Sequence, residues 1–314
     1  MKKLIYCILA LAALTLAGCN KVSSGAGADG EALDAVFTVS TESPAAATKA
    51  YSDGSTADEL VVAVYRYEGG TAPANLIYLP AVSKTVPIAT STTVHLSLIR
   101  GERYEIVFWA QKSGNGFYTF DTAARKITVN PAGPANDETR DAFYAKYSTG
   151  VVSAALNETV SLKRPFAQIN VLTTNADWQA ALDSQIAFAG SSMSLTAPTV
   201  LDLISGGVSE PKAWTLSRAA IVSASPNVGT YAATHKYIAM NYILAAPESV
   251  NAAVTFSVYK TGSDAALNTR TVSNVPYRRN YRTNIVGEVF SVDGQFNVVI
   301  VPAYATPDNT VTLP

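Results

Sequence analysis

Cys19 is the side chain of this sequence with the most clearly indicated chemistry. It ends the run Leu16-Ala17-Gly18-Cys19, which follows two N-terminal lysines and an apolar stretch from Leu4 to Ala17. The small residues before Cys19 allow an extended chain in a peptidase cleft, and the thiol can be acylated before cleavage. The apolar stretch is too short to span a bilayer. The pattern predicts a lipoprotein signal peptide over residues 1–18 and membrane attachment through a lipid on Cys19.

The cysteine count then excludes a disulfide in the mature chain. Cys7 leaves with the signal peptide, and the other cysteine, Cys19, carries the lipid. Stability must come from hydrophobic burial, for which the remaining length is sufficient in one or two domains.

The two histidines do not form part of a recognisable catalytic or metal-binding pattern. His95 alternates with Val94 and Leu96, which indicates an exposed or hydrogen-bonded side chain on a strand, and His235 begins a strand close to Tyr231. Motifs of serine hydrolases, metalloproteases and glycine-rich phosphate loops do not occur. We therefore expect no enzyme activity, no metal and no cofactor.

Carboxylates gather at Asp137, Glu138 and Asp141, beside Arg140. Their spacing lacks the alternation of acidic residues and the glycine of a tight calcium loop. We interpret this segment as a solvated charged loop.

Exposed tryptophan rings can stack against sugars. Trp109 lies in an apolar strand and is predicted to be in the core. Trp178 and Trp214 lie near the ends of predicted elements, so a packing role and a ligand role both stay open for them.

Composition favours a β-rich surface protein over a nucleic-acid-binding protein or a helical enzyme. The 23 Lys and Arg residues nearly balance the 24 Asp and Glu residues, which leaves no basic field for nucleic acid. Charged residues make up 15% of the chain and apolar residues 48%, and Thr, Ser, Val and Tyr are abundant.

The elements that position these residues are predicted to be strands. Residues 19–32 form a flexible tether rich in Ser, Gly and Ala, and the chain beyond them alternates short apolar runs with turn residues. Period-two alternation is clear at Val94, Leu96 and Leu98. The predicted strands are Ala35 to Ser40, Leu60 to Tyr67, Leu76 to Val82, Thr93 to Ile99, Tyr104 to Ala110, Lys126 to Val129, Val160 to Leu172, Ser192 to Thr196, Val200 to Ile204, Ala213 to Ile221, Lys236 to Leu244, Val254 to Tyr259, Thr269 to Val275, Tyr281 to Phe290 and Phe296 to Val301.

A helix-capable stretch from Asn175 to Gln185, with Asp177 as its expected cap, interrupts the strands. It divides them into two sets of about seven. The sequence therefore predicts two β-sandwich domains, an N-terminal one over residues 33–172 and a C-terminal one over residues 173–314.

Four stretches of this sequence resemble fimbrillin-type lipoproteins of Bacteroidales, the group that builds type V pili. The stretches are Tyr104 to Ala110, Arg140 to Tyr144, Lys163 to Val171 and Val275 to Gly287. The resemblance implies an all-β fold of two transthyretin-like Greek-key sandwiches in tandem. It also implies that subunits assemble by exchanging strands.

The first predicted strand has the properties of a strand that could be released. Its apolar stripe precedes a long soft stretch from Ser40 to Thr56. In the resembled family a trypsin-like protease cuts after a basic residue just beyond the first strand. Lys49 is the only basic residue between Lys21 and Arg66 and is the candidate cleavage site. The stripe consists of Leu33, Ala35, Phe37 and Val39.

The C-terminal end is the candidate donor strand. Its alternating apolar residues are Phe296, Val298 and Ile300, followed in the tail by Val311 and Leu313. For residues 296–301, an ordinary edge strand within their own domain is the alternative.

These features favour a structural subunit of a cell-surface fimbria or adhesin, activated by proteolysis and assembled by donor-strand exchange. Its expected partners are copies of itself or related pilins, the processing protease and the outer membrane through the lipid, with no nucleic acid. The alternative is a surface lipoprotein that binds glycans or proteins without polymerising.

Overall fold

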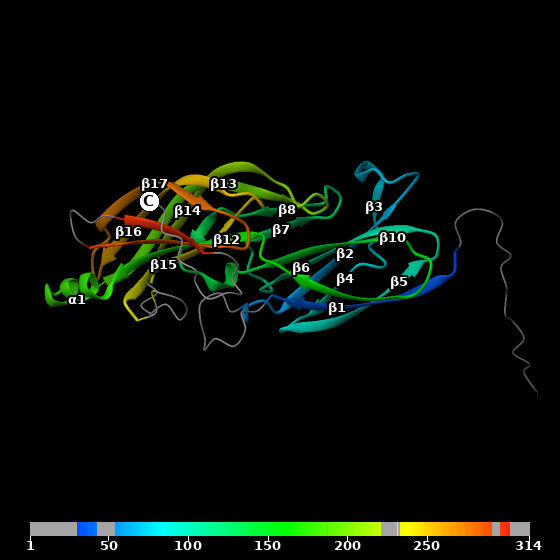
Figure 1. The fold of residues 1–314 in the computed structure, drawn as a ribbon, viewed down its shortest axis with the longest axis horizontal. Helices are drawn as coiled ribbons and strands as arrows, with labels where there is room; N and C mark the ends of the chain where they lie inside the picture. The colour runs from blue at the N-terminus through cyan, green and yellow to red at the C-terminus, as the bar shows by residue number, and fades with distance from the viewer. Residues whose placement is uncertain are drawn as a thin grey trace, which may run out of the picture.

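The computed structural model describes residues 30–42, 54–186, 188–220, 231, 233–290 and 296–301. Cys19, Lys49, Val311 and Leu313 therefore lie outside the described residues. Strands dominate the described chain and form two bodies end to end, with β1 to β6 in one and β15 to β19 in the other (Figure 1). The all-β prediction is confirmed. No helix within these ranges is long and apolar enough to cross a membrane.

Two sheets form the first body. In the smaller sheet, β1 (Ala32–Thr41) lies between β11 (Leu156–Leu162), to which it is parallel, and β5 (Ser91–Ile99), to which it is antiparallel. The larger sheet has the order β10 (Phe143–Val151), β6 (Arg103–Gln111), β2 (Glu59–Tyr67) and β3 (Leu76–Tyr78), with β4 (Lys84–Pro87) also on β2. Alternating apolar residues such as Phe37, Val94 and Phe108 fill the space between the sheets.

Two further sheets form the second body. One has the order β15 (His235–Leu244), β12 (Phe166–Thr174), β18 (Arg282–Gly287) and β19 (Phe296–Val301). The other has the order β17 (Ala266–Tyr277), β16 (Val250–Lys260), β13 (Phe188–Asp202), β14 (Val208–Ala219) and β9 (Ala132–Pro134). β8 (Lys126–Val129) pairs with β13, and β7 (Tyr118–Asp121) pairs with β8. Ile169, Trp214 and Phe256 lie in the core of this body.

Strand pairing does not follow the expected division at residues 172 and 173. β12 forms its ladders with β15 and β18, so it belongs by hydrogen bonding to the second body. β8 and β9 also pair there, although they precede β10 and β11 of the first body in sequence. The outer face of β2 and β6 packs against the same core through Tyr65, Val107 and Trp109. Division of the chain into two independently folding units stays a prediction.

The predicted helix is present as α1 (Asn175–Asp183), but its cap is one turn earlier than expected. The Thr174 side chain accepts a hydrogen bond from the Asp177 backbone N–H at 3.0 Å, so Thr174 is the N-cap. Asp177 lies in the first turn, where its carboxylate also accepts from the Phe290 N–H at 3.1 Å. Two short 3-10 turns cover Pro73–Asn75 and Glu138–Arg140.

The tryptophans pack against protein. Trp109 is in the core, as predicted, and Trp214 is fully buried with its indole N–H directed at the carbonyl of Ala197. Trp178 contacts the rings of Phe188 and Phe290, with ring centres 5.2 and 6.0 Å away.

Candidate functional site

The first strand, β1, fills the centre of its sheet with an apolar stripe. Ala35, Phe37 and Val39 are at most 1% exposed, and Leu33 is partly buried beside them. The Phe37 ring lies 5.5 Å from that of Phe108 and 5.3 Å from that of Tyr147. These are the residues that the sequence analysis assigned to a releasable strand, and the structure brings them together on the buried face.

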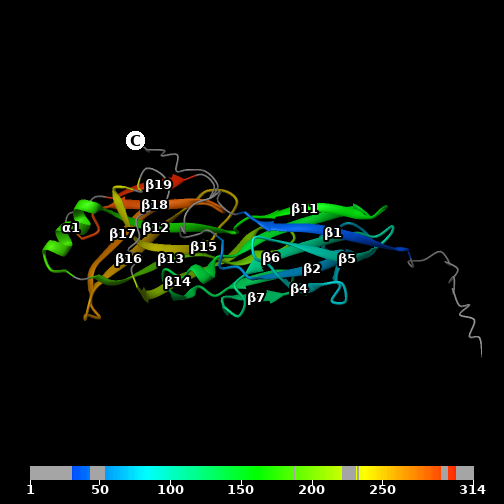
Figure 2. The ribbon, with the colours of Figure 1, turned by 90° about the horizontal axis from the view of Figure 1, so that it is seen from below.

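Both neighbours of β1 are edge strands of the same three-stranded sheet (Figure 2). Phe37 lies opposite Val94 on β5 and opposite Glu158 on β11. Without β1, these two edges would each lose a ladder of backbone hydrogen bonds, and the core would open between them. A replacement strand that keeps the direction of β1 would restore both ladders.

The two ends of β1 are held by backbone contacts. At its start, a side chain at Gly30 would place a Cβ 2.3 Å from the Arg100 carbonyl oxygen, and the Arg100 N–H donates to the Glu31 carbonyl at 2.9 Å. At its end, the Thr41 N–H donates to the Thr90 carbonyl at 3.1 Å, and the Glu42 N–H donates to the Leu162 carbonyl at 3.0 Å. β1 therefore fits one register.

The outer face of β1 contributes less. Asp34 and His95 are 3.6 Å apart, and more than half of each side chain is exposed. Such exposed pairs contribute about 0–1 kcal/mol. The inward stripe is the main attachment of β1 to the protein.

Each histidine has a polar neighbour close in sequence or on the adjacent strand. His95 faces outward beside Asp34, and His235 Nδ1 lies 2.7 Å from the Thr234 hydroxyl, with the Tyr231 ring against its own. Burial lowers the pKa of His235 and favours the neutral ring. Among the described residues, no three His, Cys, Asp or Glu side chains gather in a way that would hold a metal.

The interpretation of residues 137–141 as a solvated loop is wrong. Asp141 and Arg164 are both fully buried, and the guanidinium donates two hydrogen bonds to the carboxylate, at 2.8 and 2.7 Å. The Arg164 guanidinium also lies 4.5 Å from the centre of the Phe143 ring. A charge can be buried in this way because its partner satisfies it with a bidentate contact. The partner is 23 residues away, so the local sequence did not reveal it.

Three of the four stretches that carry the family resemblance meet where the two bodies join. The Tyr144 and Lys163 backbones exchange hydrogen bonds of 2.8 and 3.1 Å. Asn280, at φ 60°, donates from its N–H to the Phe166 carbonyl at 2.8 Å. The Arg279 guanidinium donates to the Gly206 carbonyl at 2.7 Å. The first of these contacts lies within the first body and the other two lie within the second, on either side of the link from β11 to β12. Sequence reasoning did not assign this role to these residues.

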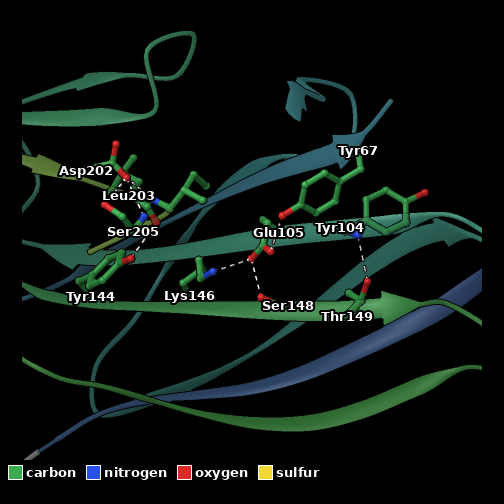
Figure 3. Close-up of polar contacts among 11 residues, drawn as sticks. Tyr67, Tyr104, Glu105, Tyr144, Lys146, Ser148, Thr149, Asp202, Leu203 and Ser205 are labelled. Atoms are coloured by element: carbon green, nitrogen blue, oxygen red, sulfur yellow. Dashed lines mark hydrogen bonds and ion pairs between the residues drawn. The ribbon is translucent and has the colours of Figure 1, made fainter. Parts of the chain in front are cut away.

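Figure 3 shows polar contacts of β10 and β6, among them one between Tyr144 and Leu203. The Tyr144 hydroxyl donates to the Leu203 carbonyl at 2.7 Å, which ties β10 to the end of β13. Further along, the Glu105 carboxylate accepts hydrogen bonds from the Tyr67 hydroxyl at 2.9 Å and the Ser148 hydroxyl at 2.6 Å. It also forms an ion pair with Lys146 at 3.0 Å. Burial and the hydrogen bond to Glu105 raise the pKa of Tyr67, so its hydroxyl stays a donor. Glu105 has its charge satisfied by these partners, as expected for a structural group.

The structure describes three of the five candidate donor residues. Phe296, Val298 and Ile300 belong to β19, which pairs antiparallel with β18 at the edge of its own sheet. Val298 packs against the core of the second body. This arrangement is the edge-strand alternative for residues 296–301. Val311 and Leu313 lie outside the described residues.

The sequence matches one family model. The model, described as a family of unknown function (DUF6562), covers residues 27–314. The chain belongs to this family. No curated protein matches the sequence.

The chain is similar to a number of solved structures, and three fimbrial proteins are among them. The fimbrial anchor protein Mfa2 from Porphyromonas gingivalis is 11% identical, over 88% of this chain and 100% of that one, with a TM-score of 0.45. The C-terminally truncated tip fimbrial protein Mfa3 of the same organism is 11% identical, over 85% and 99%, with a TM-score of 0.44. A fimbrial assembly protein from Parabacteroides distasonis is 13% identical, over 90% and 100%, with a TM-score of 0.41.

Proposed function

We propose that this protein is a structural subunit of a cell-surface fimbria, in which removal of β1 opens a groove for a strand of the next subunit. The observation that carries the proposal is the central place of β1 between two edge strands, with its apolar stripe buried. The sequence resemblance to fimbrillin-type lipoproteins supports the same function.

The energies suit a replaceable strand. Burial of a large apolar side chain contributes about 1.5–3 kcal/mol, so burial of the stripe on β1 contributes about 5–9 kcal/mol, and its backbone ladders add to this. An empty groove would lose this stabilisation and expose unpaired edges, so the cut protein would bind a new strand strongly.

The geometry suits growth into a fibre. β1 lies in the first body, and β19, which leads to the C-terminal tail, lies in the second (Figure 1). A contact from the second body of one subunit to the first body of another is head-to-tail and does not close on itself. Repeated contacts of this kind produce a filament.

Cleavage after Lys49 is the proposed trigger, and trypsin treatment of the purified protein tests it. Wild-type protein should lose its N-terminal segment and form filaments visible by negative-stain electron microscopy. Lys49→Ala should block both, and Lys49→Arg, which keeps a trypsin site, should behave as wild type. Normal filaments from Lys49→Ala would contradict activation at this position.

Attachment to the outer membrane through Cys19 is proposed as the state before cleavage. Labelled palmitate and cell fractionation test it in cells expressing the whole chain. Cys19→Ala should lose both the label and the membrane fraction. Cys7→Ala should keep both, because Cys7 lies within the signal peptide and carries no lipid. Equal labelling of Cys19→Ala and wild type would reject the assignment.

A further inference from the structure

The strands β16, β13 and β14 are neighbours in one sheet (Figure 2). Small hydroxyl side chains line their outer face. Inward residues of these strands, such as Met193, Leu216 and Phe256, are buried in the core, so the alternate residues point outward. The outward residues of the three strands at this point are Ser192, Ser194, Thr215, Ser217, Thr255 and Ser257.

This face contains a shallow hollow of about 330 Å³, here called the hydroxyl hollow. Its volume is at the lower end of small-molecule sites. Ser192 and Ser194 on the central strand are short, whereas Tyr259 and Arg218 form a wall at one end. The Arg218 guanidinium lies 4.8 Å from the Tyr259 ring centre, and the Tyr259 hydroxyl lies 3.1 Å from that of Ser192.

Cross-strand contacts hold part of the hydroxyl hollow in place. The Thr255 hydroxyl lies 2.8 Å from that of Thr271, and the Ser257 hydroxyl lies 2.9 Å from that of Thr269. A hydroxyl donates one hydrogen bond and accepts up to two, so each paired group retains capacity for a ligand. Groups that are already ordered lose less entropy when a ligand binds.

The charge of the lining is positive. Arg218 is the charged residue that lines the hydroxyl hollow, and no described lining residue is acidic. Its guanidinium donates to the Ser263 carbonyl at 2.6 Å and lies 3.5 Å from Asp264, whose side chain is fully exposed. An exposed pair of this length is weak, so a ligand carboxylate can displace Asp264.

We propose that the hydroxyl hollow binds a sugar that carries a carboxylate. The serine and threonine hydroxyls can both donate hydrogen bonds to and accept them from the hydroxyl groups of a sugar ring. Tyr259 offers an aromatic surface to the ring. The Arg218 guanidinium pairs with the sugar carboxylate. The hollow lies on the second body, away from β1. Sugar binding is therefore expected whether or not the protein assembles by strand exchange.

Titration of the purified full-length chain with methyl β-D-glucuronide tests the proposal, with methyl β-D-glucoside as the uncharged comparison. Isothermal titration calorimetry and ligand-observed NMR should both show saturable binding of the glucuronide. The glucoside should bind about tenfold or more weakly, since a hydrogen bond to a charged group contributes about 1.5 kcal/mol or more. Absence of saturable glucuronide binding would overturn the proposal.

Three variants locate the site. Arg218→Gln should weaken glucuronide binding about tenfold and leave glucoside binding unchanged. Ser194→Leu fills the hollow from an outward position and should abolish binding of both sugars. Lys212→Gln, which removes an exposed cation of the same strand outside the hollow, should bind as wild type. Thermal unfolding and circular dichroism establish that each variant is folded. Binding that survives Ser194→Leu, or glucuronide binding that is equal in Arg218→Gln and wild type, would overturn the assignment.

Discussion

Glu42 and Asn280 are joined by a hydrogen bond of 2.9 Å, from the Asn280 side-chain amide to the Glu42 carboxylate, across 238 residues of sequence. Glu42 immediately follows β1, and Asn280 lies just before β18 in the second body. The end of the proposed releasable strand is thus tied to the body that does not contain it. Loss of β1 removes a contact between the two bodies as well as the centre of a sheet.

Glu42→Ala should loosen the end of β1 without affecting its apolar stripe. The expected loss is about 1 kcal/mol of stability, in the range of a single hydrogen bond. Faster hydrogen exchange at the last amides of β1 is the sharper readout, measured against Glu68→Ala, whose exposed pair with Arg66 is remote from β1. Unchanged exchange in Glu42→Ala would mean that the contact does not hold the strand.

Phe37→Ala should destabilise the first body by about 3–5 kcal/mol, because it leaves a cavity against Phe108 and Tyr147. Val36→Ala, on the outward face of the same strand, should cost less than about 1 kcal/mol. Urea unfolding of the uncut chain gives both values. Similar losses for the two variants would show that the inward stripe is not the main attachment.

The buried pair of Asp141 and Arg164 predicts strong coupling. Asp141→Asn or Arg164→Met alone should lower the free energy of unfolding by about 3–5 kcal/mol. Each substitution removes one charge of the pair and leaves the opposite charge buried without it. The double variant Asp141→Leu with Arg164→Met should cost clearly less than the sum of the single variants. A double-mutant cycle in urea measures this difference, and additive losses would contradict the predicted coupling.

Asp58 predicts an acid-sensitive contribution to stability. Hydrogen bonds from Lys112 and from the Ser113 backbone lower the pKa of Asp58 from 3.8 to about 2. A depressed acid stabilises the fold at pH values above its unfolded pKa, and this contribution is lost as the pH falls from about 4 towards 2. The stability advantage of wild type over Asp58→Asn should therefore be constant above pH 5 and shrink in that window. Urea midpoints between pH 2.5 and 6 measure it, and a constant difference throughout would contradict the assignment.

The sequence predicted the strands better than their partners. Period-two patterns such as Val94, Leu96 and Leu98 are local and identify β5 directly. The pairing of β9 with β14 joins Ala132 to Thr215, and no feature of a three-residue strand specifies so distant a neighbour. Hence the grouping of β8 and β9 with the second body could not be predicted.

Two local expectations were wrong. The sequence predicted separate strands from Ser192 to Thr196 and from Val200 to Ile204, yet β13 is continuous through both, with Pro198 opposite Pro211 in its ladder with β14. Asp141 suggested solvent exposure because its polarity is visible in the sequence and its distant partner Arg164 is not. The apolar stripe of β1 was predictable, since burial of one strand face depends on the strand's own alternation.

The C-terminal tail should decide how efficiently filaments grow after the cut. A strand that replaces β1 must turn apolar side chains towards Phe108 and the rest of the core, and the alternation at Val311 and Leu313 fits that requirement. Truncation after Tyr304 should permit trypsin cleavage and impair filament growth.

Val311→Asp with Leu313→Asp should also impair filament growth, because burial of an unpaired carboxylate is costly. Thr310→Asp with Thr312→Asp adds equal charge on the opposite face of the tail and should retain most growth. Filament lengths by electron microscopy distinguish the two. Normal growth from the truncated chain would exclude the tail as donor and leave residues 296–301 as the strand that must leave its own sheet.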